Sequence, residues 1–209
     1  MAQLKQDRAL YTRAKIIRAA AEVFDDLGFA SASLSKIVNR AGVTIGAVYF
    51  HFTSKEELAR AVMAEQVTDM TFPAGEEGLQ LVIDITLDVA RQLQHNTLLR
   101  AGIRLAVEQG AFGLEDDAAY SLWTELLRRQ LAVARERGEL LDRVDEREFA
   151  QLLVGAYTGT QLVSQITAGH DDLTERIATL WYYFLPGVAV PEVIPRLRLE
   201  PATSDTESF

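Results

Sequence analysis

The residues best suited to recognising another molecule lie close together, in the segment SLSKIVNRAGVTIGAVYFHF at residues 33–52. Thr44 and Tyr49 carry hydroxyl groups and His51 carries an imidazole. Polar side chains of this kind hydrogen-bond to phosphate oxygens and to base edges. Tyr49 and His51 fall near the exposed end of a short predicted helix. The chemistry that these residues predict is recognition of a nucleic acid.

Two helices joined by a tight turn must position these side chains. Ser33 is a suitable N-cap for the first helix, and Thr44 for the second. Gly42 permits the sharp turn between them, which a side chain would obstruct. In the second helix Ala47 and Val48 face inward. The apolar residues of the first helix recur at helical spacing: Leu34, Ile37, Val38 and Ala41. The pattern is a helix-turn-helix, whose second helix fits the major groove of B-DNA.

The net charge of −9 argues against DNA binding until its distribution is considered. Residues 1–60 contain nine Lys/Arg and six Asp/Glu, a net charge of +3, so the rest of the chain carries −12. A basic head on an acidic body suits a protein that contacts phosphate at one end only. Chance asymmetry is the alternative explanation.

Nearly the whole chain has helical periodicity, which predicts an all-α fold. Residues 1–67 form the first predicted domain, a three-helix DNA-binding unit that includes the helix-turn-helix at about 33–52 and is followed by a fourth helix. A helical ligand-binding and dimerisation domain follows at 68–185. Residues 186–209 hold four of the five prolines and predict an extended tail with a composition typical of disorder. Further helices are expected at 12–27, 54–65, 79–93, 98–109, 118–137, 145–168 and 173–185.

Other function classes find no support in the sequence. The three histidines, His51, His95 and His170, fall in different segments without metal-ligand spacing, and no nucleophile–base pair or phosphate-binding glycine loop is present. The chain has no cysteine, which excludes disulfides and thiolate metal sites. No apolar run reaches the roughly 20 residues of a membrane span. We expect no enzyme, no cofactor, no metal, and a cytoplasmic, nucleoid-associated protein without a signal peptide.

Residues 12–62 resemble the DNA-binding domain of the TetR family of bacterial repressors along its whole length. The segment AGV-x-x-GA-x-YFHF-x-x-KEEL is far more specific than a generic helix-turn-helix. Position 45 departs from the family pattern, because Ile45 stands where a lysine or another polar residue is common. The departure puts one phosphate or base contact in doubt at this position.

The resemblance implies that a homodimer binds a palindromic operator of double-stranded DNA. Thr44, Tyr49, His51 and Lys55 would bind phosphates, with Lys55 in the first turn of a helix that an S-x-x-E capping box at Ser54 begins. Ile45 and Gly46 would approach base edges. The alternative for Lys55 is a solvated charge. The complete set of expected DNA-binding residues is Ser33, Thr44, Ile45, Gly46, Tyr49, His51, Lys55, Arg13 and Lys36.

The resemblance also implies that the last two long helices pair with those of a second subunit. Gly155, Gly159 and Ser164 in the helix 145–168 permit close approach of another helix. The aromatic run WYYF, residues 181–184, is more apolar surface than one helix usually hides. Burial within a monomer core is the alternative.

Trp123, in the phrase DDAAYSLWTELL, resembles the tryptophan that lines the pocket of the γ-butyrolactone receptor subgroup. That resemblance implies a small lactone or butenolide ligand and control of secondary metabolism. Taken alone, a tryptophan among leucines is more often core. Thr158 and Gln161 share one helix face and are assigned to the ligand's polar groups, with hydrogen bonding across a dimer interface as the nearest alternative. Gln66 is a further candidate.

Two other functions remain compatible with the sequence. One is a TetR-type repressor of an efflux pump that answers to lipophilic drugs. The other is a ligand-blind DNA-binding or architectural dimer. A narrow response to lactones would exclude the first, and ligand-induced release from DNA would exclude the second.

Overall fold

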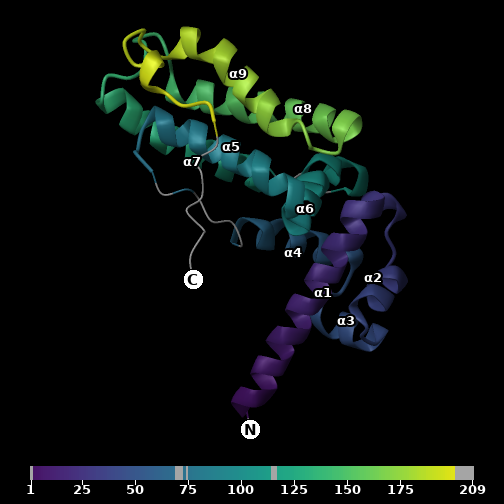
Figure 1. Cartoon of the computed structure of the whole chain (residues 1–209). Coiled ribbons are helices and arrows are strands. Elements are labelled where there is room, and N and C mark those ends of the chain that lie inside the picture. Colours follow the sequence, from purple (N-terminus) through teal and green to yellow (C-terminus); the bar gives the residue numbers. More distant parts are fainter. Residues whose placement is uncertain (1, 69–72, 74, 114–116, 201–209) are drawn as a thin grey trace, which may run out of the picture. The chain divides into compact units, whose positions relative to one another are not determined.

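The computed structural model describes residues 2–68, 73, 75–113 and 117–200 (Figure 1). Within these ranges the chain is almost entirely helical, and the one β-type pairing is an isolated antiparallel bridge between Leu140 and Ala189. The all-α prediction is therefore confirmed. None of the described helices is long and apolar enough to cross a membrane. The chain forms two compact units, residues 1–70 with 96–119, and residues 71–95 with 120–209.

Helix α1 (Ala2–Ser31) begins ten residues before the predicted start at residue 12. Its buried face is the predicted one, with Ile16, Ile17 and Phe24 no more than 1% exposed. Gly28 interrupts the helix with φ 72° and ψ 171°, a conformation that favours glycine because it lacks a Cβ. The prediction that Gly28 ends the regular helix is thus correct. After Gly28 the chain makes one further helical turn, to Ser31, before the next helix begins.

The helix-turn-helix consists of α2 (Leu34–Ala41) and α3 (Ile45–His51). The Ser33 hydroxyl accepts a hydrogen bond from the Lys36 amide at 3.4 Å, and the Thr44 hydroxyl accepts one from the Ala47 amide at 3.2 Å. Gly42 adopts the left-handed conformation, with φ 58° and ψ 42°. Both caps and the glycine turn are therefore as predicted, because each depends on residues adjacent in sequence.

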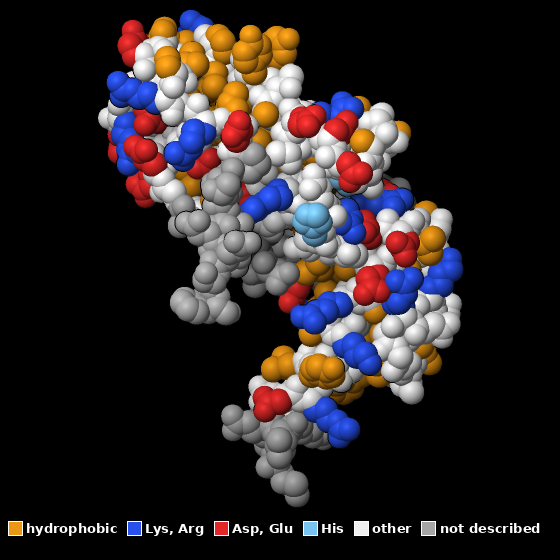
Figure 2. Space-filling view, viewed as in Figure 1, with side chains coloured by type: hydrophobic (Ala, Val, Ile, Leu, Met, Phe, Trp, Pro, Cys, Tyr) orange, Lys and Arg blue, Asp and Glu red, His pale blue; other side chains and the backbone are white. Residues whose placement is uncertain are grey.

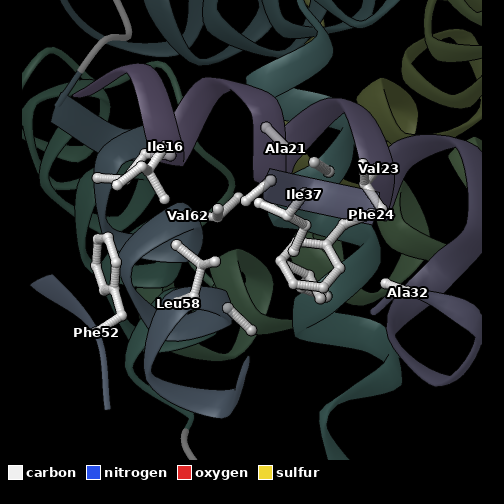
Figure 3. Close-up of a cluster of buried hydrophobic side chains, with 14 of the residues drawn as sticks. Ile16, Ala21, Val23, Phe24, Ala32, Ile37, Phe52, Leu58 and Val62 are labelled. Atoms are coloured by element: carbon white, nitrogen blue, oxygen red, sulfur yellow. The ribbon is translucent and has the colours of Figure 1, made fainter. Parts of the chain in front are cut away.

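Helix α4 (Lys55–Thr68) starts at a modified capping box. The Ser54 hydroxyl accepts from the Glu57 amide at 3.1 Å, as predicted. The Glu57 carboxylate returns one residue further than the standard motif, to the Thr53 amide and hydroxyl, each at 2.6 Å. These hydrogen bonds lower the pKa of Glu57. Figure 3 shows the core that α1, α2 and α4 form, with Ile16, Phe24, Ile37, Leu58 and Val62 pointing toward one another.

Helix α6 (Thr97–Glu108) belongs to the first unit although it lies far along the chain, and it packs on α1 and α4. Arg100 Nε donates to the Asp25 carboxylate at 2.9 Å, and the Glu108 carboxylate accepts from the Phe29 amide at 2.8 Å. The 3₁₀ helix η1 (Gln109–Phe112) follows. The sequence pattern predicts two consecutive domains and does not anticipate that α6 belongs to the first unit. The boundary after residue 67 stays a prediction.

The second unit contains α5 (Leu79–His95), α7 (Ala118–Glu136), α8 (Glu146–Ala168) and α9 (Leu173–Val188). Helix α9 packs on α5 and α8. It includes Pro186, so the predicted tail starts inside a helix and not in an extended segment. Beyond the helix lies the 3₁₀ helix η2 (Ile194–Arg196). The Gln80 side chain hydrogen-bonds to the Arg198 main chain through both its amide oxygen and its amide nitrogen. Residues 201–209 lie outside the described part.

Candidate DNA-binding and ligand-binding sites

Helix α3 presents one face to solvent and is anchored by the other. Val48 is fully buried in the core of the first unit, whereas Ile45 is 47% and Tyr49 55% exposed. Thr44 and Gly46 are exposed as well. The four residues predicted to meet DNA from this helix therefore share its outer surface. A helix with this division can enter a groove without disturbing its own packing.

Phe50 is 77% exposed on α3 and was not among the predicted site residues. Its ring meets the His51 imidazole edge-on, with the two centroids 4.9 Å apart, and His51 itself is half-buried. Sequence reasoning missed Phe50 because the YFHF run is apolar and suggests core. Its position could have identified Phe50 as exposed, since Val48 and Phe52 already occupy the inward-facing places on either side of it.

Lys55 has a structural role that the sequence did not reveal. Its ammonium donates to the carbonyl oxygens of Phe29 at 2.8 Å and Ala32 at 3.0 Å, and it lies 4.0 Å from the centroid of the Phe29 ring. Helix α4 is thereby tied to the connection between α1 and α2. These two hydrogen bonds leave at most one of the three N–H donors of the ammonium for a phosphate.

The other predicted cationic contacts are also engaged within the first unit. Lys36 donates to the Ser31 carbonyl oxygen at 3.1 Å. The Arg13 guanidinium lies 5.4 Å from the Phe52 ring centroid and 3.9 Å from a Glu65 carboxylate oxygen. Their participation in DNA binding stays a prediction, as does that of Ser33, whose hydroxyl is already used as a helix cap.

Gln66 is a buried amide in the first unit, 2% exposed, and neither its Nε2 nor its Oε1 has a hydrogen-bond partner among the described residues. It packs against Gly102 of α6, where a Cβ would lie only 2.1 Å from Gln66 Oε1. Leaving a buried amide unpaired costs free energy that a native structure usually avoids. The amide fits at this place because position 102 is a glycine and has no side chain.

The other three predicted ligand residues lie in the second unit. Trp123 is half-buried on α7. On α8, the Thr158 hydroxyl donates to the Val154 carbonyl oxygen at 2.8 Å, and Gln161, 2% exposed, contacts the ring of His170 with Oε1 3.2 Å from Nε2. The polar groups of Thr158 and Gln161 therefore already have partners within the chain, which a ligand would have to share or replace.

Tyr157 is a polar group that sequence reasoning missed. Its hydroxyl is buried and has no hydrogen-bond partner among the described residues. Burial, with the nearby Asp88 carboxylate as a second cause, raises the pKa of Tyr157 well above its ordinary value. It precedes Thr158 and lies four residues before Gln161, so its helical spacing to Gln161 could have identified it.

Helices α8 and α9 leave a broad apolar surface exposed. Trp181 is an exception to the predicted aromatic interface, because it is fully buried within the second unit and its Nε1 donates to the Thr86 hydroxyl at 2.8 Å. Gly155 and Gly159 have open space where a Cβ would lie. The large apolar side chains exposed on the two helices are Leu152 (59%), Val163 (49%), Ile166 (83%), Tyr182 (67%) and Tyr183 (73%).

The chain matches two family models that together span most of it. Residues 16–62 match the model for bacterial regulatory proteins of the tetR family, and residues 76–191 match the tetracyclin repressor-like C-terminal domain. The A-factor receptor protein of Streptomyces griseus is 41% identical over 196 residues, which cover 94% of this chain and 70% of the relative.

Two solved structures extend the likeness to the fold. Full-length native TylP, a TetR regulator from Streptomyces fradiae, is 42% identical with a TM-score of 0.81, covering 92% of this chain and 93% of that one. A γ-butyrolactone receptor described as ArpA-like is 32% identical with a TM-score of 0.73, covering 90% and 94%. With its helix-turn-helix and its helical C-terminal unit, the chain belongs to the TetR family of bacterial transcriptional regulators.

Proposed function

We propose that the protein is a repressor whose homodimer binds a palindromic DNA operator and leaves it when a γ-butyrolactone or a butenolide binds. The outward face of α3, with Thr44, Ile45 and Tyr49 exposed around the buried Val48, carries the DNA-binding part of this proposal. Family membership supports it, because TetR-family proteins regulate transcription by binding DNA and are not enzymes. Such a protein acts in the cytoplasm, at the nucleoid.

In the proposed complex each subunit places α3 in a major groove of the operator. The exposed hydroxyls of Thr44 and Tyr49 bind phosphates and set the register, while Ile45 and Gly46 approach the base edges. An apolar Ile45 cannot hydrogen-bond to a base, so its contribution is van der Waals contact, for example with a thymine methyl group. The exposed apolar surface of α8 and α9 supports dimerisation through these helices.

The lactone part of the proposal is supported by the relatives and by two buried polar groups. A 41% identical relative is an A-factor receptor, and a 32% identical structure is a γ-butyrolactone receptor. Gln66 and Tyr157 hold hydrogen-bonding capacity that no described residue uses, as polar groups that fix a ligand's orientation do. We assign Trp123, Thr158 and Gln161 of the second unit to the ligand, and Gln66 of the first unit is a separate candidate. The ligand releases DNA only if it binds the DNA-incompetent state more tightly.

Operator binding tests the proposal directly. We expect the wild-type protein to bind DNA from upstream of its own gene in a fluorescence anisotropy titration, and a γ-butyrolactone or butenolide to release it. Tyr49→Ala should raise the operator Kd at least tenfold, because it removes one phosphate contact from each subunit of the dimer. Tyr49→Phe keeps the ring but lacks the hydroxyl, so it should restore only the part of the operator affinity that comes from contacts of the ring. Release by structurally unrelated lipophilic drugs would favour an efflux regulator, and DNA binding that no ligand releases would overturn the lactone assignment.

Trp123→Ala should reduce the response to the lactone without changing the operator Kd. The half-buried indole would contribute apolar contact to the ligand, so its loss should raise the lactone concentration for half-maximal release by tenfold or more. Leu122→Ala is the matched control, since Leu122 is the preceding residue of α7 and is 47% exposed. An unchanged lactone response in Trp123→Ala would place the pocket elsewhere.

A further inference from the structure

The solvent-facing side of α1 carries a cationic stripe formed by Arg8, Tyr11, Lys15 and Arg18. These residues are spaced i, i+3, i+7 and i+10, which places them along one face of the helix. All four are exposed, and Tyr11 is 71% exposed. Figure 2 shows cationic and apolar side chains side by side along this helix. The stripe lies opposite the buried face that includes Ile16 and Phe24.

The cations of this stripe differ from Arg40, which is an ion-paired cation of the same unit. No ion pair joins Arg8, Lys15 or Arg18 to any carboxylate in the described part of the chain, whereas Arg40 pairs with Glu22 at 2.7 Å and with Asp26 at 3.4 Å. Glu22 occupies the next position after Arg18 on the same face, so the stripe ends where internal ion pairing begins. Its three positive charges are thus left for an external anion.

The stripe is continuous with the helix-turn-helix. The Lys15 ammonium lies 3.8 Å from the position that a Cβ on Gly42 would occupy, so it stands beside the turn that leads into α3. From Arg18 to Arg8 the stripe then extends for about 15 Å along the helix axis. An anion that fits it must be extended, must carry several charges, and must pass close to the outward face of α3.

Residues 6–15 of α1 contribute no buried side chain to the core. The next residue, Ile16, is fully buried. A helical segment that buries no side chain is only marginally stable in water. These turns therefore gain little by folding alone and gain more when a partner neutralises their charge.

We propose that the stripe of Arg8, Tyr11, Lys15 and Arg18 binds the DNA phosphate backbone that flanks the base pairs facing α3. The inference rests on the proposed DNA binding and adds a second, sequence-independent contact surface to it. Duplex DNA carries regularly spaced charges, about one per 3.4 Å of axis on each strand, so a 15 Å stripe can meet several phosphates. Lys55, Lys36 and Arg13 make contacts within the first unit, whereas the stripe supplies exposed positive charge for phosphate binding.

The salt dependence of operator binding tests this proposal. For the double variant Arg8→Gln/Lys15→Gln, the slope of log K against log salt concentration should become shallower by about 3.6, because a dimer loses four phosphate contacts at about 0.9 each. Binding to non-operator DNA should weaken by the same factor. Arg8→Lys/Lys15→Arg should restore the slope. Arg129→Gln/Arg147→Gln removes the same charge from exposed positions of the second unit and should leave the slope unchanged.

The outcomes separate the two proposals. If the wild-type protein shows no salt-dependent operator binding, the proposed function fails. If the wild type binds and the double variant keeps the wild-type slope, the stripe inference alone is overturned, even where the affinity falls. Because both residues are exposed, thermal unfolding followed by circular dichroism should give the same Tm for all variants. A lower Tm in the glutamine variant that the Lys/Arg exchange does not restore would show a structural role instead.

Discussion

Trp181→Ala is expected to lower the free energy of unfolding by about 3–5 kcal/mol, as truncation of a fully buried tryptophan does. The indole of Trp181 is 0% exposed, lies edge-on to the Phe149 ring with the centroids 6.2 Å apart, and donates to the Thr86 hydroxyl at 2.8 Å. Its removal leaves a cavity where α9 packs on α5 and deletes that hydrogen bond. Urea unfolding followed by circular dichroism at a fixed protein concentration measures the change.

Trp181→Phe is the control for the cavity. A phenyl ring fills most of the space but lacks the N–H donor. The Thr86 hydroxyl keeps its own hydrogen bond to the Ile83 carbonyl oxygen at 2.8 Å, so it is not left without a partner. We therefore expect a smaller loss, about 1–2 kcal/mol. If Trp181→Ala cost less than 1 kcal/mol, the indole would belong to an exposed interface, as the aromatic run suggested from the sequence.

Lys55→Met is expected to destabilise the first unit by about 2–4 kcal/mol, because two carbonyl oxygens lose their charged donor. The variant keeps most of the apolar stem but leaves the Phe29 and Ala32 carbonyls without the ammonium that now lies at 2.8 and 3.0 Å. The cation–π contact with the Phe29 ring is lost as well. Urea unfolding measures stability, and anisotropy at a temperature where the variant is folded measures operator binding.

Lys36→Met separates the structural role from a DNA contact. Among the described residues the Lys36 ammonium makes one hydrogen bond, to the Ser31 carbonyl oxygen, and the residue is exposed, so its replacement should cost less than 1 kcal/mol of stability. Wild-type stability in Lys55→Met together with a weaker operator complex would contradict the structural assignment. It would instead support the phosphate contact that the family resemblance implies for this lysine.

The helix-turn-helix could be predicted in detail because its determinants are local. The caps at Ser33 and Thr44 and the turn at Gly42 each depend on residues within three or four positions. The buried face of α1 could also be predicted, since periodicity alone identifies it. Long-range contacts could not. Examples are the packing of α6 on α1 and α4 and the hydrogen bonds from Lys55 to two carbonyl oxygens. These contacts join residues between 23 and about 80 positions apart.

The ligand candidates show the same division. The sequence could place Thr158 and Gln161 on one helix face, but not the His170 ring that approaches Gln161 or the carbonyl that occupies the Thr158 hydroxyl. The run at 181–184 indicated aromatic surface, and only the fold separates the buried Trp181 from the exposed Tyr182 and Tyr183. For Gln66, the space that the amide occupies depends on Gly102, which is 36 residues away in sequence.

The discontinuity of the first unit limits how the protein can be recombined. Its core is completed by Ala101 and Leu105 of α6, both 0% exposed, which the chain supplies only after passing through α5. A DNA-reading module transplanted as residues 1–70 would expose the apolar faces of α1 and α4 that α6 now covers. Exchange of operator specificity between relatives is therefore confined to surface positions of α2 and α3, or it must carry α6 along. In this chain the DNA-reading helices and α6 therefore share one hydrophobic core, although α5 separates them in the sequence.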